Sequence, residues 1–405
     1  MALIENSAPL LADGGIRVGQ WKTLVKGLFS TSFALGGDSA IRWDKDGALT
    51  LGPDRIIPLC VLAEQYPGIL PVLRSQVREV PAHTLPLHEF LTLGRADWHH
   101  LPIGESDRRL CRALEKGPLS LQQAADAVGV DKYLLHTGLL EKASVILRAG
   151  LTPTDVMHVR GDYTRYCREA SQLAVQFAAN SLRMLPEEFC GRIYDDVSRE
   201  VFYGVSQLLL EHSSPYFLRY GLDNGMRELL RLQWENRHTG GDSLLHYAFR
   251  APAALVGIGG PVHLFLPEAA KALGAECIIP DCAPTANAVG AVTGRMSASA
   301  EAEVRPHGLS PDDSVQGDWE VLCDGQPPRY FADEAEAAAW AEARLRERTE
   351  KSLRAQGATG ELSFVSRVND MTADILVGGV KLCTRIRVTA STCLMQTAVK
   401  ENRHV

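Results

Sequence analysis

Residues 254–294 read ALVGIGGPVHLFLPEAAKALGAECIIPDCAPTANAVGAVTG, and this stretch decides the fold. A short apolar strand ends at Val256, a glycine-rich turn follows it, and apolar residues then recur at helical spacing as far as Gly274. Residues 277–279 form the next short strand, and the small residues of 287–294 predict a tightly packed helix. This order of strand, glycine turn, helix and strand predicts an α/β protein.

The turn in this unit contains Gly257, Gly259, Gly260 and Pro261. Glycine has no Cβ, so the backbone can approach a ligand closely, and the N-terminus of the next helix presents free N–H groups to an anion. Similar turns occur in many α/β domains without binding any ligand. The turn alone therefore leaves both interpretations open.

A second glycine turn, LGGDS, spans residues 35–39 and is expected to follow a strand that contains Phe33 and Leu35. Its backbone N–H groups and the Asp38 carboxylate together suit a phosphate with a bound Mg²⁺. The alternative is an ordinary turn in which Asp38 and Ser39 bond to their own backbone. The spacing by itself favours this alternative.

These motifs, taken together, resemble those of the hydantoinase A/5-oxoprolinase family and occur in that family's order. The resemblance rests on VGIGGP before a long helix, the run at 280–291, LGGDS, the G-P-x-R-x-x-P-L segment at 52–59, and GLTPTDVMHV at 150–159. It implies an actin-like or sugar-kinase-like ATPase fold that uses ATP and Mg²⁺. The implied reaction is hydrolysis of a cyclic amide, such as a hydantoin or 5-oxoproline. Acetone-carboxylase chemistry, which uses the same fold, is an alternative.

The same resemblance implies roles for individual residues. Asp38 is the candidate catalytic residue, which would hold the metal or orient a water molecule. Asn287 would hydrogen-bond the nucleotide or brace the turn, and a helix-capping role explains Asp155 as well as a role in the site does. The other implied nucleotide-binding residues are Gly36, Gly37, Ser39, Gly257, Gly259, Gly260 and Pro261.

The sequence lacks two phosphate-binding loops of the family pattern, and this changes the fold that we expect. Family members carry two D-x-G-G-T phosphate loops, and this sequence contains neither; Met1–Ile4 would align just past the second loop. We therefore expect an N-terminally incomplete fold. A second polypeptide, either a hydantoinase B-like subunit or the missing N-terminal half, would complete the site. The alternative is a non-catalytic subunit or remnant that binds a partner chain.

Composition narrows the class of protein further. The chain has 405 residues, 45% of them hydrophobic, and a formal net charge of −7, which does not favour a nucleic acid or an anionic membrane as partner. No apolar run reaches membrane-spanning length, and the N-terminus does not read as a signal peptide. The nine cysteines are scattered singly, as expected of reduced thiols in a cytoplasmic protein.

Four segments are expected along the chain. Residues 1–103 would form part of an ATPase subdomain, in which prolines make the stretch from 60 onward irregular. Residues 104–150 would be a helical insertion, 151–305 the nucleotide-binding subdomain, and 306–405 a small α+β domain. In the last segment a helix capped by Asp333 precedes strands in which the inward positions are Leu382, Thr384, Ile386 and Val388.

The expected insertion contains a pattern with helix-turn-helix spacing, at residues 119–142. Its second helix would carry only Lys132 and Lys142 as cations, fewer than a DNA reader needs to neutralise phosphates. A packing role is therefore preferred, and a DNA-binding regulator is the less favoured alternative.

Overall fold

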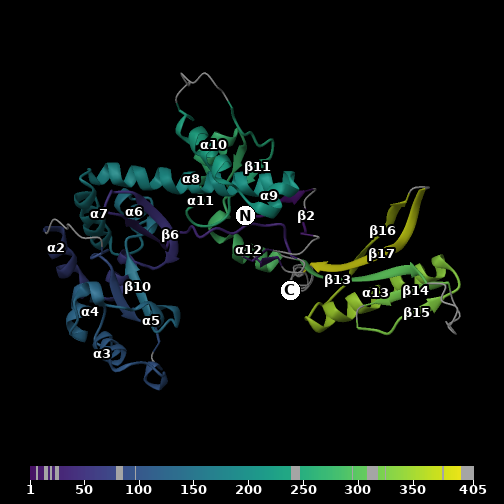
Figure 1. Ribbon diagram of the computed structural model, residues 1–405, viewed down its shortest axis with the longest axis horizontal. Helices are drawn as coiled ribbons and strands as arrows, with labels where there is room; N and C mark the ends of the chain where they lie inside the picture. The colour runs from purple at the N-terminus through teal and green to yellow at the C-terminus, as the bar shows by residue number, and fades with distance from the viewer. Residues whose placement is uncertain are drawn as a thin grey trace, which may run out of the picture. The chain divides into compact units, whose positions relative to one another are not determined.

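The computed structural model describes residues 1–5, 8–12, 17–18, 21–22, 27–78, 85–95, 97–238, 247–293, 295–307, 318–323, 325–375 and 378–393. The chain is mixed α/β and consists of two compact units, Met1–Pro280 and Asp281–Val405, which are described separately (Figure 1). Within the described residues, no helix has both the length and the apolar character needed to cross a lipid bilayer.

The first unit is built around a four-stranded sheet with the order β7-β10-β8-β9. Strand β10 is parallel to β7 and antiparallel to β8, which in turn pairs antiparallel with β9. The strands are β7 (Ile57–Pro58), β8 (Phe90–Leu93), β9 (Leu119–Ser120) and β10 (Ile146–Gly150).

Residues 60–103 contain several helices, which follow β7 and β8 along the chain. The stretch expected to be irregular contains α1 (Leu59–Gln65), η1 (Pro67–Ile69), α2 (Leu70–Arg78) and η2 (Trp98–His100), so that expectation was wrong. Pro67 and Pro71 lie in the first two positions of η1 and α2, where a missing N–H costs no helical hydrogen bond.

The segment expected as a helical insertion is also corrected. It contains α3 (Glu105–Leu114), α4 (Leu121–Val128), η3 (Lys132–Leu134) and α5 (Gly138–Lys142), but it ends in β10. Because β10 lies between β7 and β8, residues 104–150 are part of the sheet rather than a self-contained addition. Their helices share one apolar core with β8 and β10, made by Leu91, Trp98, Leu110, Leu114, Leu140 and Ile146.

A hairpin and three helices complete the main core of the first unit. The hairpin strands are β5 (Ser39–Trp43) and β6 (Leu49–Arg55), and the helices are α6 (Pro153–Arg160), α7 (Arg168–Leu182) and α8 (Pro186–Ser213). The strand expected through Phe33 and Leu35 is absent, since β5 begins only at Ser39. Phe33 instead lies against α8, where a Cβ on Gly204 would come within 2.5 Å of its ring.

The predicted strand–turn–helix–strand unit is confirmed. Strands β11 (Ala254–Val256) and β12 (Glu276–Ile278) are parallel and joined by α11 (Val262–Leu273), which ends at Gly274 in the left-handed conformation, with φ +61°. Helices α9 (Pro215–Tyr220) and α10 (Asn224–Glu235) precede it. The short N-terminal strands are β1 (Ile4–Glu5), β2 (Ala8–Pro9), β3 (Arg17–Val18) and β4 (Trp21–Lys22).

The second unit is a small α+β structure, with α13 packed on a five-stranded antiparallel sheet of order β15-β14-β13-β17-β16. Its elements are η4 (Ala283–Thr285), α12 (Ala286–Thr293), β13 (Arg295–Pro306), β14 (Trp319–Cys323), β15 (Arg329–Phe331), α13 (Glu334–Ala355), β16 (Ser363–Ile375) and β17 (Gly378–Cys393). The boundary expected at residue 305 moves to residue 280, because β13 is the middle strand of this sheet.

Two local expectations in this unit have different outcomes. The side chain of Asp333 caps α13 by accepting the N–H of Glu336, as predicted. The predicted alternation of inward and outward side chains is correct from Thr384 to Val388, which are buried at every second position. It is wrong at Leu382, whose side chain is 52% exposed. The register of β16 against β17 shifts between Met371 and Thr372, opposite Cys383 and Lys381, and this irregularity moves Leu382 outward.

Candidate functional site

The two glycine turns, far apart in the sequence, line one cavity of about 170 Å³ in the first unit. Pockets that enclose a drug-sized ligand are usually ~300–1,000 Å³, so this cavity suits part of a ligand, such as one planar ring. None of the residues that line it is charged. They are Leu35, Gly36, Gly37, Pro153, Val197, Val201, Ile258, Gly259, Pro261, Val262, Phe265 and Leu266.

The first turn is held in place by the N-terminus of α6. The carbonyl of Gly37 accepts hydrogen bonds from the N–H of Thr154 at 2.9 Å and from its hydroxyl at 2.6 Å. A Cβ on Gly37 would lie 2.7 Å from that hydroxyl, so only glycine fits here. Ser39 is buried, and its Oγ accepts the N–H of Gly36 at 2.9 Å. The hydroxyl expected to contact phosphate is thus engaged within the turn.

Asp38 lies beside this turn and is not among the residues that line the cavity. Its Oδ2 accepts Nε of Arg55 at 2.8 Å and Nη2 at 2.7 Å. Mg²⁺ requires near-octahedral oxygen ligands, and the described residues contain no cluster of three acidic, histidine or cysteine side chains. One carboxylate that is already paired with arginine does not fit a Mg²⁺ site on this chain.

The second turn leaves several backbone donors free. The N–H of Gly257 bonds to the carbonyl of Ile278 at 2.8 Å, whereas in the described part of the chain the N–H groups of Gly259, Gly260 and Val262 have no acceptor. Gly259 has φ +111°, a conformation that other residues rarely adopt. The unpaired N–H groups lie at the N-terminus of α11, which favours a polar or anionic part of a ligand there.

The cavity wall between the turns is apolar and comes from α8 and α11. Val197 and Phe265 are 4% and 6% exposed. The ring of Phe265 packs edge-on against Tyr194, with ring centroids 5.0 Å apart, and the Tyr194 hydroxyl donates to Asp162 at 2.6 Å. Burial and this hydrogen bond raise the pKa of the Tyr194 hydroxyl, which keeps it protonated as a donor. Polar contacts behind Phe265 thus fix the orientation of one wall.

Asp155 anchors the base of the first turn. It is fully buried, and its two oxygens accept the N–H groups of Leu59, Cys60 and Thr152 and the hydroxyls of Thr152 and Ser171. Thr152 and Asp155 also form the capping box of α6, which confirms the capping interpretation of Asp155. Burial raises the pKa of the Asp155 carboxyl, although the hydrogen bonds that it accepts oppose this rise.

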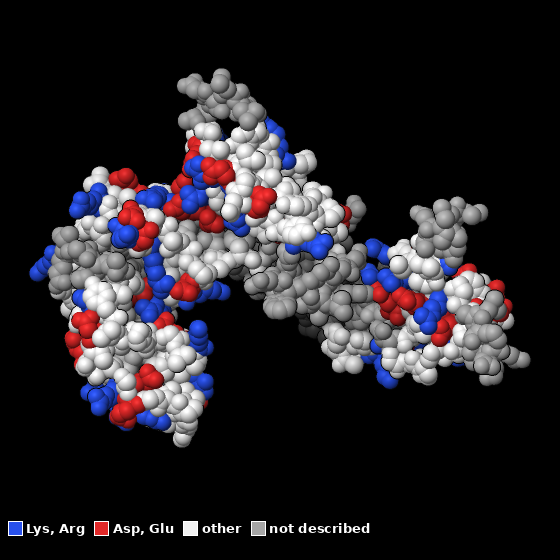
Figure 2. Space-filling view, in the orientation of Figure 1, with Lys and Arg blue, Asp and Glu red and all other residues white. Residues whose placement is uncertain are grey.

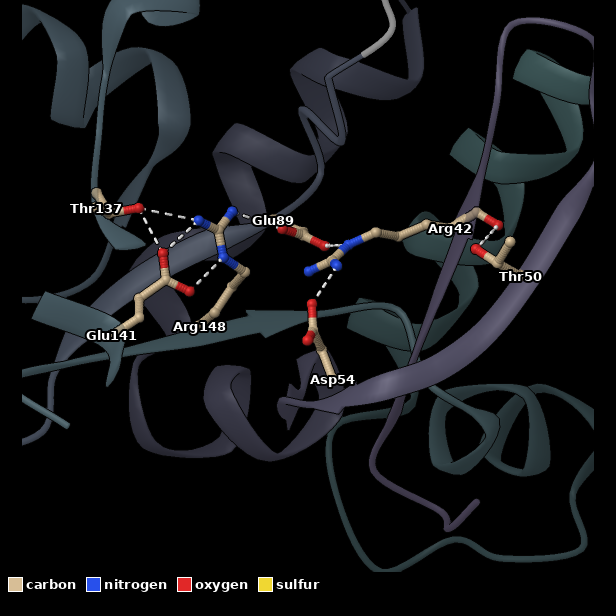
Figure 3. A network of polar contacts seen from close by, with 7 residues as sticks. All are labelled: Arg42, Thr50, Asp54, Glu89, Thr137, Glu141 and Arg148. Atoms are coloured by element: carbon tan, nitrogen blue, oxygen red, sulfur yellow. Dashed lines mark hydrogen bonds and ion pairs between the residues drawn. The ribbon is translucent and has the colours of Figure 1, made fainter. Parts of the chain in front are cut away.

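A second buried carboxylate connects β5, β8 and β10 (Figure 3). Glu89 has a fully buried side chain that accepts Nε of Arg42 and Nη1 of Arg148, both at 2.7 Å. Arg148 also binds Glu141 at 2.6 Å, and Arg42 binds Asp54 at 2.6 Å. This network fixes the β5–β6 hairpin, which leads out of the LGGDS turn, against the four-stranded sheet.

His88, the residue before Glu89, is fully buried, and neither of its ring nitrogens has a hydrogen-bond partner. Its ring stacks on Trp43, with centroids 5.1 Å apart, and tilts against Phe177 at 5.3 Å. Burial lowers the pKa of His88 from 6.5 to about 4; Glu89 opposes this shift and Arg42 adds to it. The folded protein therefore holds His88 neutral.

His88 should make the first unit acid-sensitive. Between pH 6.5 and 4 the unfolded chain binds more protons at this residue than the folded chain does. The stability that the neutral form of His88 supports is therefore fully present above pH 6.5 and is lost on acidification. At pH 4 the free energy of unfolding is lower by about 3 kcal/mol because of this residue. We expect His88→Phe to remove this part of the pH dependence in urea unfolding, and the exposed-site variant His100→Phe to retain it. Parallel pH profiles for His88→Phe and the unchanged chain would contradict the assignment.

Of the residues proposed from the sequence, the structure brings Gly36, Gly37, Gly259 and Pro261 to the cavity, whereas Asp38, Ser39, Gly257 and Gly260 do not line it. Asn287 is exposed on α12, in the second unit. Sequence reasoning missed the wall residues of α8 and α11, because their apolar spacing is the same as that of ordinary core residues.

No protein-family model, curated protein or solved structure matches this chain.

Proposed function

We propose that this cytoplasmic chain is the nucleotide-binding part of an ATP-dependent cyclic-amide hydrolase with an actin-like fold, completed by a second polypeptide. The observation that carries the proposal is the cavity shared by the LGGDS and GIGGP turns, which are the two motifs that the family resemblance assigns to the nucleotide. Its apolar wall suits a purine base, and the free N–H groups at the N-terminus of α11 suit the polar part of the same ligand.

In such a reaction ATP supplies a phosphoryl group that makes the amide carbonyl of the ring a better electrophile for water. The residues of this chain would contribute binding and orientation. Val197, Val201 and Phe265 would exclude water from one face of the base. Asp38, held by Arg55 at the side of the turn, would orient a water molecule at the edge of the site.

An exposed apolar face supports the second polypeptide. Parallel strands are normally covered on both faces, yet the two-stranded β11–β12 sheet leaves Val256 and Ile278 60% and 41% exposed. Ile258, in the turn after β11, is 58% exposed. A partner that covers this face would also reach the mouth of the cavity, because Ile258 lines it.

The DNA-binding alternative loses support. The expected second helix of the pattern is divided into η3 and the five-residue α5, which is too short to serve as a recognition helix. On the face shown in Figure 2, Lys and Arg side chains are interspersed with Asp and Glu over the described surface of the first unit, without a broad area of one sign. A phosphate-binding surface would instead gather positive charge on one face.

Filling the cavity should weaken nucleotide binding. Val201 lines the cavity from α8 and is only partly buried, so Val201→Phe places extra volume in the space proposed for the base. We expect the dissociation constant for an N-methylanthraniloyl derivative of ADP to rise at least about tenfold, measured by fluorescence anisotropy.

The matched control is Leu218→Phe, which enlarges a side chain that is 47% exposed on α9 and does not line the cavity. Its affinity should equal that of the unchanged chain. Saturable binding that Val201→Phe leaves intact would contradict the placement of the base, and no saturable binding by the unchanged chain would contradict the nucleotide-binding function itself.

A further inference from the structure

Strand β16 forms one edge of the sheet in the second unit. It is 13 residues long and pairs with β17 along its whole length, while no described strand pairs with its other side. An edge of this length presents a row of unpaired backbone N–H and C=O groups, which is the template for strand addition.

Three exposed apolar side chains lie along β16. Val365, Val368 and Met371 are 56%, 57% and 41% exposed. Natural edge strands are usually blunted by proline, by charged side chains such as lysine, by bulges or by being short. Strand β16 is long and has no proline or lysine; its charged residues are Arg367, Asp370 and Asp374. Figure 1 shows α13 and the β16–β17 hairpin of the second unit. Helix α13 contacts β16 through Glu342, which accepts the hydroxyl of Ser366 at 2.6 Å, and it leaves Val365, Val368 and Met371 exposed.

We propose that β16 pairs antiparallel with β16 of a second copy of this chain, with the two-fold axis at Val368. The pairing would join the two five-stranded sheets into one. A two-fold axis between antiparallel strands is perpendicular to the sheet, so each side chain stays on its own face. One residue must therefore lie directly opposite its own counterpart.

The sequence of β16 selects Val368 as that residue. With the axis there, Val368 meets Val368, and Val365 lies opposite Met371 of the second copy, so each of these three exposed apolar side chains faces another one. Arg367 then lies opposite Asn369, and Asp370 opposite Ser366, so no like charges are paired.

Placing the two-fold axis at a neighbouring residue gives less favourable side-chain pairs. An axis at Arg367 or at Asp370 would place two like charges directly opposite each other, which is destabilising. An axis at Asn369 would place Val368 opposite Asp370, an apolar side chain against a charge. Of the four central positions from Arg367 to Asp370, only Val368 makes the strand self-complementary, and this property favours a second copy over an unrelated strand.

A charge at the axis should separate the copies. In Val368→Lys two ammonium groups meet at the two-fold axis, so we expect the dissociation constant of the dimer to rise at least about tenfold, measured by analytical ultracentrifugation of the full chain. The control is Leu382→Lys, because Leu382 is 52% exposed on the same hairpin but lies on β17. It should remain dimeric. A monomeric unchanged chain, or a Val368→Lys dimer of unchanged affinity, would overturn the proposal.

Disulfide crosslinking tests the register independently of any loss of folding. Directly opposite residues have Cβ atoms about 4.5–5.5 Å apart, close enough for a disulfide after small adjustments. In a background that lacks the exposed Cys282, we expect Val368→Cys to crosslink two chains under mild oxidation. Asn369→Cys, one position along and opposite Arg367, should crosslink no more than the background does. Equal crosslinking of both variants, or none with Val368→Cys, would overturn the register.

Discussion

Asp155→Ala is expected to lower the melting temperature of the first unit by on the order of 10 °C, from a loss of about 3–5 kcal/mol in its free energy of unfolding. The carboxylate is fully buried and accepts five hydrogen bonds from three segments: the start of α1, the start of α6, and α7. Removing it leaves the N–H groups of Leu59 and Cys60 buried without an acceptor.

Asp155→Asn separates hydrogen bonding from packing. Both carboxylate oxygens face backbone donors, Oδ1 that of Cys60 and Oδ2 those of Leu59 and Thr152. An amide nitrogen in either position meets an N–H group, so the asparagine variant should also be strongly destabilised although its volume is unchanged.

Asp333→Ala is the matched control, because Asp333 is an exposed cap of α13 in the second unit. It should cost about 1 kcal/mol, and only in the transition of that unit. Calorimetry of the full chain resolves the two transitions if the units unfold separately. An Asp155→Ala transition of the first unit that stays within about 2 °C of the unchanged chain would refute the anchoring role.

Glu89→Gln is expected to destabilise the first unit by about 3–5 kcal/mol, because it removes the buried negative charge that pairs with two partly buried arginines. Arg42 and Arg148 are 30% and 17% exposed, whereas Glu89 is fully buried (Figure 3). Burial lowers the pKa of the Arg148 guanidinium, but its bonds to Glu141 and Glu89 outweigh burial and raise it, so the guanidinium stays charged.

An exposed ion pair provides the comparison for Glu89. Glu105 and Arg112 on α3 are 3.1 Å apart and 60% and 57% exposed, so Glu105→Gln should change stability by about 1 kcal/mol or less. The measurement is the urea midpoint of the first unit for both variants at neutral pH. Equal shifts for the two variants would show that the buried network contributes no more than a surface pair.

Local patterns explain what the sequence allowed us to predict. The β11–α11–β12 unit depends on neighbouring residues: an apolar strand, a glycine turn, a helical face and Gly274 in the left-handed conformation at the end. The cap of α13 at Asp333 has the same local character. Such signals act within a few residues, so the printed order of amino acids contains them.

Contacts between distant segments explain what could not be predicted. No spacing rule connects Glu89 with Arg42 and Arg148, which come from different strands. The sequence predicts only helices for residues 104–150 and not β10, because the partners of β10 lie far from it in sequence. The sequence pointed to the glycine turns but not to the wall of the cavity, since Val197 and Phe265 have the spacing of any buried helical face.

The strand order of the second unit has a consequence for biosynthesis. Strand β13 is in the middle of the sheet, and one of its two neighbours, β17, is the last strand that the structure describes. At about 5–20 residues per second, a ribosome would complete β17 roughly 4–20 s after β13. During this interval one edge of β13 has no partner, and nascent chains could pair there instead. We therefore expect slower translation through residues 307–393 to increase the fraction of newly made protein that aggregates.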